Sequence, residues 1–81
     1  MANILILSVE SRNKDALKVQ QVLSKAGCII KTRLGIHEAS EDSCSDKGLI
    51  ILELAGKPSE IKSLISKIDA IKSVKTKFVK I

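Results

Sequence analysis

Two segments that are apolar at nearly every position constrain this chain most: Ile4–Val9 and Leu49–Leu54. A strand turns successive side chains to opposite faces of its sheet, so each segment presents apolar side chains to both faces. Both faces must therefore be covered. The rest of the sequence predicts only two helices, which suffice for one face, so the pattern favours a protein that completes its fold by assembly.

The length of 81 residues predicts one domain spanning residues 1–81. A domain of this size buries roughly 60% of the surface of its unfolded chain, and oligomerisation is a common way to stabilise it. The sequence has no apolar run of about 18 residues, as a membrane-spanning helix requires, and no signal-peptide pattern. We therefore expect a cytoplasmic protein with no membrane partner.

The formal net charge of +5 raises the question of a nucleic-acid partner. Lysines of the last third alternate with apolar residues at helix and strand spacing, which is typical of a solvated face. They are Lys57, Lys62, Lys67, Lys72, Lys75, Lys77 and Lys80. The single aromatic residue, Phe78, provides no platform on the central strands for stacking bases. The sequence therefore disfavours nucleic-acid binding.

The first half of the chain predicts a strand and an amphipathic helix. After the strand, Ser11 can cap a helix by accepting a backbone hydrogen bond. The helix runs to about Ala26, and Gly27 is expected to end it with left-handed backbone dihedrals. Leu17 falls outside the apolar arc of this helix, so we expect it to be exposed.

The later elements are expected to be a strand, a polar loop, a strand, a helix and a strand. Their predicted ranges are 28–38, 39–47, 48–55, a helix beginning at Pro58, and 74–81. In the second strand, Cys28, Ile30, Thr32, Leu34 and Ile36 are expected to share one face. The apolar pattern shifts between Phe78 and Val79, which predicts a bulge there.

This βαββαβ order predicts an α+β, ferredoxin-like fold: a four-stranded antiparallel sheet with two helices on one face. We expect the first and third strands to be central and to run parallel to each other. Their uninterrupted apolar triplets should face the helices: Leu5, Leu7 and Val9 with Ile50, Leu52 and Leu54.

The other face of the sheet is then open and is the predicted oligomer interface. It consists of Ile4, Ile6, Ser8, Leu49, Ile51 and Glu53. An exposed apolar patch of about 400 Å² is unusual on a monomer. Burying it would contribute about 10 kcal/mol of favourable free energy before the costs of association are subtracted. We expect a homodimer or homotetramer, with Ser8 and Glu53 close together at the carboxyl ends of two parallel strands.

The residues that could carry chemistry form no recognisable catalytic set. The sequence lacks a nucleophile triad, paired carboxylates and a glycine-rich phosphate loop, so we expect neither an enzyme nor a bound cofactor. Both cysteines are expected to be free thiols, Cys28 in the core and Cys44 in a polar loop. His37, Cys44 and the nearby acidic residues match no standard zinc spacing, so no metal site is predicted. They leave open a metal- or redox-responsive interaction protein as the alternative function.

With these elements in place, the chain resembles the stand-alone ACT-like proteins known as iron-only hydrogenase system regulators. The resemblance covers nearly the whole chain. It rests on the residues Val9-Glu10-Ser11-Arg12 and Arg33-Leu34-Gly35-Ile36, together with the segments 19–23, 49–54, 64–68 and 74–75.

This resemblance implies a small regulatory or ligand-sensing domain that associates through its sheet. From the residues, we expect a small anionic effector to bind at the subunit junction, because backbone N–H groups at a helix N-terminus favour anions. The candidate residues are Ser11, Arg12, Asn13 and Lys14 from one subunit, with Arg33 and His37 from the edge strand of its neighbour. Another regulatory protein is the alternative partner.

Overall fold

The structure is a computed structural model, described here for residues 2–10, 12–39 and 44–81. Within these ranges, the side chains of residues 12–14, 16, 36–39 and 44–47 lie outside the description. The elements in chain order are β1 (Asn3–Val9), α1 (Arg12–Lys25), the short 3₁₀ helix η1 (Gly27–Ile29), β2 (Ile30–Ala39), β3 (Cys44–Leu54), α2 (Pro58–Asp69) and β4 (Val74–Lys80). The predicted order of elements is confirmed.

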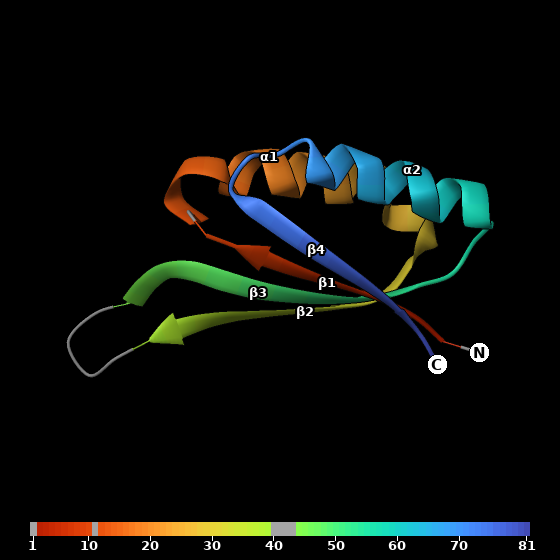
Figure 1. Cartoon of the computed structure of the whole chain (residues 1–81), viewed down its shortest axis with the longest axis horizontal. Helices are drawn as coiled ribbons and strands as arrows, with labels where there is room; N and C mark the ends of the chain where they lie inside the picture. Colours follow the sequence, from red (N-terminus) through yellow and green to blue (C-terminus); the bar gives the residue numbers. More distant parts are fainter. Residues whose placement is uncertain (1, 11, 40–43) are drawn as a thin grey trace.

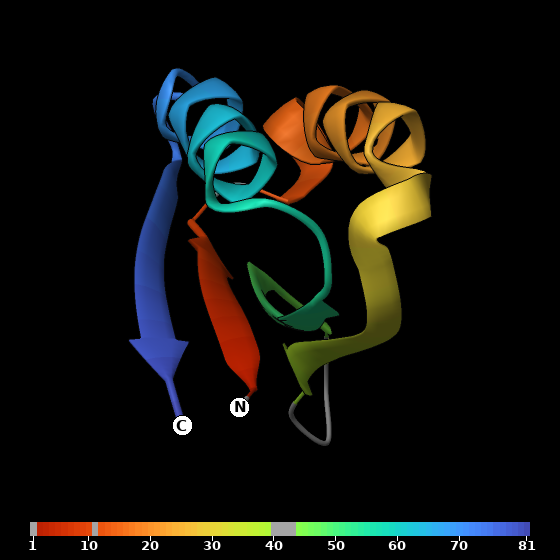
Figure 2. The same cartoon turned by 90° about the vertical axis from the view of Figure 1, so that its right-hand side faces the viewer.

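The four strands form one sheet in the order β2-β3-β1-β4, and each neighbouring pair is antiparallel. Both helices lie on the same side of this sheet (Figure 1 and Figure 2). The predicted ferredoxin-like fold is therefore confirmed, but the expected parallel course of β1 and β3 is wrong. Because the crossover through α1 makes β1 and β2 parallel, β3 must oppose both once it returns from β2 as a hairpin and lies between them.

The core lies between the helices and the sheet face that was predicted to meet them. Leu5, Leu7 and Leu52 have no exposed surface. The other buried apolar residues are Val9, Val19, Leu23, Leu54, Ile61, Leu64, Ile68, Ile71 and Val74, and half-buried Ile50 packs against them. The inward orientation of both apolar triplets is thus confirmed, and so is the exposure of Leu17, at 71%.

The connection after α1 differs from its prediction. The backbone of Gly27 is not left-handed; the residue instead starts η1, in which the Ile29 N–H donates to the Ala26 carbonyl at 3.0 Å. This turn places Cys28 on the surface, so its predicted core position is wrong. The left-handed glycine is Gly56, with φ of 117°, in the turn between β3 and α2.

Strand β2 carries an irregularity in its pairing with β3. Ile30 pairs with Leu54 and Thr32 pairs with Glu53, so Lys31 is an extra residue in the ladder. The bulge turns Ile30 toward the core, whereas the prediction placed it on the same face as Thr32. Residues 39 and 44–47, predicted as loop, belong to the strands, while residues 40–43 lie outside the description.

The last strand is regular. Phe78 pairs with Leu5 and Val79 with Ile4, with no shift of register between them. The predicted bulge is therefore wrong. The two adjacent apolar residues reflect burial on opposite faces instead: Phe78 packs against the core below α2, and Val79 lies beside Ile4 on the other face of the sheet.

Candidate functional site

The sheet face that points away from the helices carries side chains from all four strands. We call it the open face. Its described members are Ile4, Ile6, Ser8, Thr32, Leu34, Leu49, Ile51, Glu53, Lys75, Lys77 and Val79, as the cross-strand register requires. The predicted interface residues are thus brought together on one surface.

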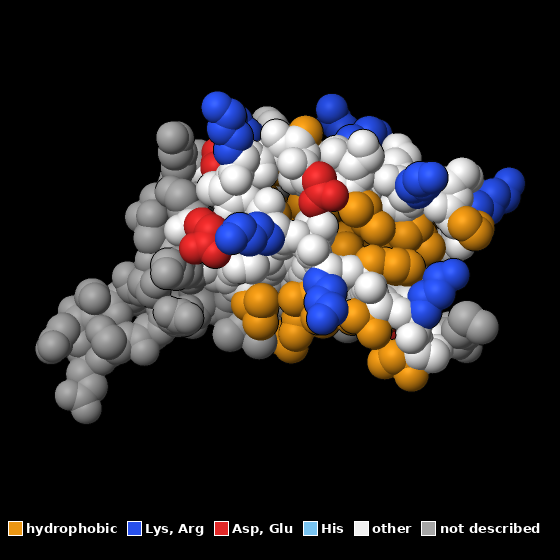
Figure 3. Space-filling view, viewed as in Figure 1, with side chains coloured by type: hydrophobic (Ala, Val, Ile, Leu, Met, Phe, Trp, Pro, Cys, Tyr) orange, Lys and Arg blue, Asp and Glu red, His pale blue; other side chains and the backbone are white. Residues whose placement is uncertain are grey.

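The centre of the open face is apolar. Leu34 on β2, Ile51 on β3 and Ile6 on β1 form one cross-strand row, which ends at Lys77 on β4. Leu34 is 52% exposed and the two isoleucines are only half-buried. In Figure 3, groups of apolar side chains lie along the side of the molecule away from the helices, and a larger group lies between α2 and the strands. A single chain therefore leaves apolar surface exposed to water. A partner that buries this surface would gain about 25 cal/mol of free energy per Å².

The polar residues of this face lie at opposite ends of it. Ile4 pairs with Glu53 and Ser8 pairs with Leu49, so four positions of β1, about 13 Å, separate the two polar side chains along the strand. The expected proximity of Ser8 and Glu53 is wrong because the strands are antiparallel. Glu53 instead forms an ion pair with Lys31, in which the Lys31 Nζ lies 3.6 Å from the Glu53 Oε2. Both side chains are partly exposed, so this ion pair forms a polar rim at one end of the face.

The predicted effector residues fall into two groups. Arg12, Asn13 and Lys14 form the first turn of α1, with side chains outside the described part, and Ser11 lies outside it entirely. The backbone of His37 reaches the same end of the sheet, since His37 pairs with Gly48 and Gly48 pairs with Val9.

Arg33 lies apart from that end of the sheet. It pairs with Leu52, which in turn pairs with Leu5, about 13 Å along the sheet from Val9. Its side chain is exposed on the edge strand. One protomer therefore does not bring Arg33 to the first turn of α1, and a combined site requires the edge strand of a second copy, as the prediction assumes.

The residues of the alternative metal site, His37 and Cys44, lie in β2 and β3 with side chains outside the description. Among the side chains that are described, no group of three or more His, Cys, Asp or Glu could hold a metal ion. Neither described helix is long and apolar enough to cross a membrane.

Two features of the structure were missed by sequence reasoning. The first is Lys31, which the bulge in β2 brings to Glu53; a period-two pattern has no signal for an extra residue. The second is Asp15, a carboxylate that is only 5% exposed on the apolar side of α1. Asp15 lies four residues before Val19 and seven before Val22, so the helical period places all three on one face, and this spacing is the sequence signal for its burial.

Comparisons with known proteins support this architecture. No protein-family model and no curated protein matches the chain. Among solved structures, an uncharacterized protein from Thermotoga maritima is 27% identical, with a TM-score of 0.81 over 96% of this chain and 92% of its own.

Two further structures are similar in fold at lower identity. The ACT domain from the GTP pyrophosphokinase of Chlorobium tepidum is 18% identical, with a TM-score of 0.64 over 96% of this chain and 95% of its own. A nitrogen regulatory PII-like protein from Thiomonas intermedia is 15% identical, with a TM-score of 0.62 over 99% of this chain and 88% of its own. The chain has a ferredoxin-like, ACT-like fold.

Proposed function

We propose that this protein is a small regulatory domain of the ACT-like type, without catalytic activity of its own, which works as a homo-oligomer. The observation that carries the proposal is the open face, on which Ile6, Ile51 and Leu34 form an apolar row that one chain leaves partly exposed. A second copy of the chain supplies a surface of matching apolar character. A homodimer, or a homotetramer built from two such dimers, covers both sides of the central strands.

The sheet edges can extend this assembly. Strands β2 and β4 have a neighbour on one side only, so each presents unpaired backbone groups along its outer edge. Burial of about 400 Å² of apolar surface is worth about 10 kcal/mol, similar to the association cost of about 4–15 kcal/mol. Pairing of β2 with a strand of a second subunit would stabilise the assembly further through backbone hydrogen bonds. It would also bring Arg33 and His37 to a subunit junction.

At that junction we place a small anionic effector. The first turn of α1 supplies backbone N–H groups and the side chains of Arg12, Asn13 and Lys14, with Ser11 preceding them. Arg33 and His37 from the neighbouring edge strand complete the positive surface. Binding that joins two subunits links the effector concentration to assembly, which is the property a regulatory domain requires.

The regulated system follows from the resemblance in sequence. We infer a role in an iron-only hydrogenase system, with another regulatory protein as the alternative partner of the assembled domain. The fold is shared with an ACT domain and with a nitrogen regulatory PII-like protein, so it is one that regulatory proteins use.

Sedimentation velocity of the untagged protein at micromolar concentration tests the assembly, and a monomer would refute it. Thermal-shift screening of small organic acids and phosphates, followed by calorimetric titration, tests the effector. Arg12→Ala and His37→Ala should weaken binding of a compound that promotes assembly, whereas Lys72→Ala, which also removes a positive charge, should not. Unchanged affinity in both variants would remove these residues from the site.

A further inference from the structure

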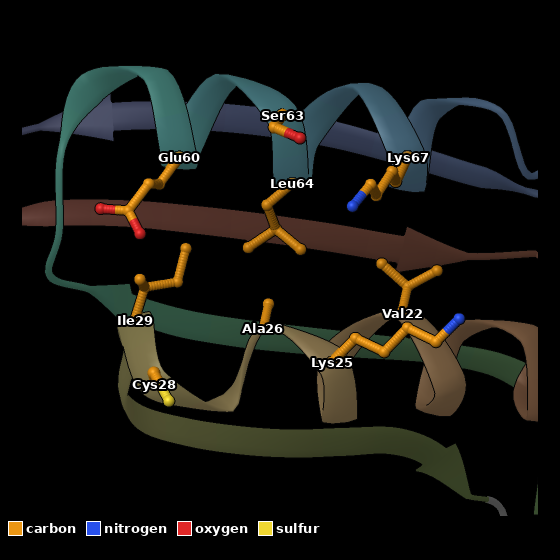
Figure 4. A pocket seen from close by; sticks show the side chains of 9 residues that line it. All are labelled: Val22, Lys25, Ala26, Cys28, Ile29, Glu60, Ser63, Leu64 and Lys67. Carbon is orange, nitrogen blue, oxygen red and sulfur yellow. The ribbon is translucent and has the colours of Figure 1, made fainter.

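A groove runs between the two helices on the outer side of the helix layer, away from the open face. Figure 4 shows it with the strands behind the helices. One hollow in it, of about 240 Å³, has an apolar floor formed by Val22, Ala26, Ile29 and Leu64. A second hollow, of about 310 Å³, continues from it along α1 and shares Val22, Lys25 and Lys67 with it. The two hollows form one continuous groove.

Positive charge is concentrated in this groove. Lys18, Lys25 and Lys67 line the second hollow, and the described residues around that hollow include no acidic side chain. The Nζ of Lys18 lies 3.7 Å from the Oδ1 of Asp15. Lys25 and Lys67 take part in neither of the ion pairs found among the described residues. Two ammonium groups therefore face the groove without an acidic partner in the described part of the chain.

The helix periodicity explains why these lysines converge. Lys18, Val22 and Lys25 are spaced four and three residues apart, so they follow one side of α1. Lys67 is three residues from Leu64 on α2, and in Figure 4 its ammonium group points toward α1. Lysines in the last turns of helices also suit the helix dipole, but the dipole does not require them to border the same groove.

The opposite end of the groove has different chemistry. Glu60 lies there, and its Oε1 accepts a hydrogen bond from the backbone N–H of Lys57 at 2.9 Å. Its carboxylate repels an anion from that end, while Ser63 offers a hydroxyl group between the two ends. These groups would orient an anion with an apolar body, placing the anionic group at Lys25 and Lys67 and the body over Val22 and Leu64.

We propose that this interhelical groove is an anion site for an organic phosphate monoester with an apolar or aromatic body. A phosphate monoester carries about two negative charges near pH 7, which matches the two lysines, and lysine binds phosphate as a compact charge. The floor contributes the hydrophobic part of the affinity. All lining residues belong to one protomer, so the site is independent of the subunit junction and stays accessible when the open face is covered.

The test uses 1-naphthyl phosphate as the probe, titrated by fluorescence and by NMR of the ¹⁵N-labelled protein. We expect saturable binding with shifts along the facing sides of α1 and α2. Replacing both lysines, Lys25→Gln with Lys67→Gln, should weaken binding by about tenfold, since it removes both positive contacts to the phosphate group. The matched control, Lys62→Gln with Lys72→Gln, has the same net charge and should bind like the wild type.

Two further ligands separate the contribution of the phosphate group from that of the naphthyl ring. Inorganic phosphate lacks the body and 1-naphthol lacks the charge, and each should bind about fivefold more weakly or worse than the probe. In a Cys44→Ser background, the probe should slow alkylation of the exposed Cys28, which lines the groove. Equal loss of affinity in both double variants, or naphthol binding as well as the ester, would overturn the proposal. The Leu34→Lys variant, in which the open face is disrupted, should bind the probe unchanged.

Discussion

The hydroxyl of Ser73, in the turn before β4, donates a hydrogen bond to Oδ2 of Asp15 on α1. The Ser73 carbonyl also accepts from the backbone N–H of Glu10 at 2.7 Å, immediately after β1. One residue thereby joins the start of α1 to the connection between α2 and β4. Since Asp15 is only 5% exposed, the fold places a carboxylate in the interior at the end of the sheet where the effector site is proposed.

Removing this hydrogen bond should destabilise the protein. Ser73→Ala takes one donor from a buried carboxylate, and we expect the free energy of unfolding to fall by about 1–2 kcal/mol. Urea denaturation followed by circular dichroism measures the change. Ser66→Ala, at an exposed position of α2, should change stability by less than about 0.5 kcal/mol, and an equal loss in both variants would contradict the role given to Ser73.

Gly56 should tolerate no side chain. Its φ of 117° favours glycine, and a Cβ built there would lie 2.8 Å from Cγ2 of Ile29. We expect Gly56→Ala to lower the free energy of unfolding by about 1–3 kcal/mol. Gly27→Ala is the control, because a Cβ at that position meets nothing within 4 Å and the backbone is not left-handed. Thermal unfolding of both variants should rank Gly56→Ala clearly below Gly27→Ala.

The N-terminus of α2 is stabilised by Glu60, which accepts the backbone hydrogen bond from Lys57. Glu60→Ala leaves that N–H to water, so we expect a loss of about 0.5–2 kcal/mol in unfolding free energy. Glu60→Gln keeps an acceptor oxygen at the same position and should recover most of the loss. If the glutamine variant is as unstable as the alanine variant, charge at the helix terminus rather than the hydrogen bond is responsible.

Two exposed leucines provide a matched test of the assembly face. Leu34 lies on the open face and Leu17 on α1, and they are 52% and 71% exposed. Leu34→Lys should raise the dissociation constant of assembly by about tenfold or more, because burying an unpaired charge is costly. Leu17→Lys adds the same charge elsewhere and should leave assembly unchanged. Sedimentation velocity over a concentration series distinguishes the two, and the reverse ranking would move the interface to α1.

Local pattern was sufficient for most of the fold. Ser8 and Glu53 interrupt one set of alternate positions, which predicted that the uninterrupted set meets the helices. Leu5, Leu7 and Leu52 of that set are completely buried. The predicted core position of Cys28 was wrong because a short apolar segment such as residues 28–30 is compatible with a strand and with a 3₁₀ turn. Packing of Ile29 against Gly56 accompanies the turn, and that contact joins segments distant in sequence.

The candidate site was predictable only in part. The open face followed from the period of two in β1 and β3, but its polar rim did not, because Lys31 meets Glu53 only through a bulge. The sequence also could not predict that two lysines face each other across the interhelical groove. Lys25 and Lys67 are on different helices, and neither helix alone shows which lysine the other will bring beside it.

The sequence by itself determined the order of strands and helices, the side of each that is apolar, and the existence of a sheet face that two helices leave open. These are properties of short segments, where side-chain periodicity and turn chemistry act within a few residues. Only the tertiary structure decided that β1 and β3 are antiparallel, which separates Ser8 from Glu53, and that Lys67 lies across a groove from Lys25. Such relationships depend on contacts between distant segments, whose geometry is set by packing the whole chain.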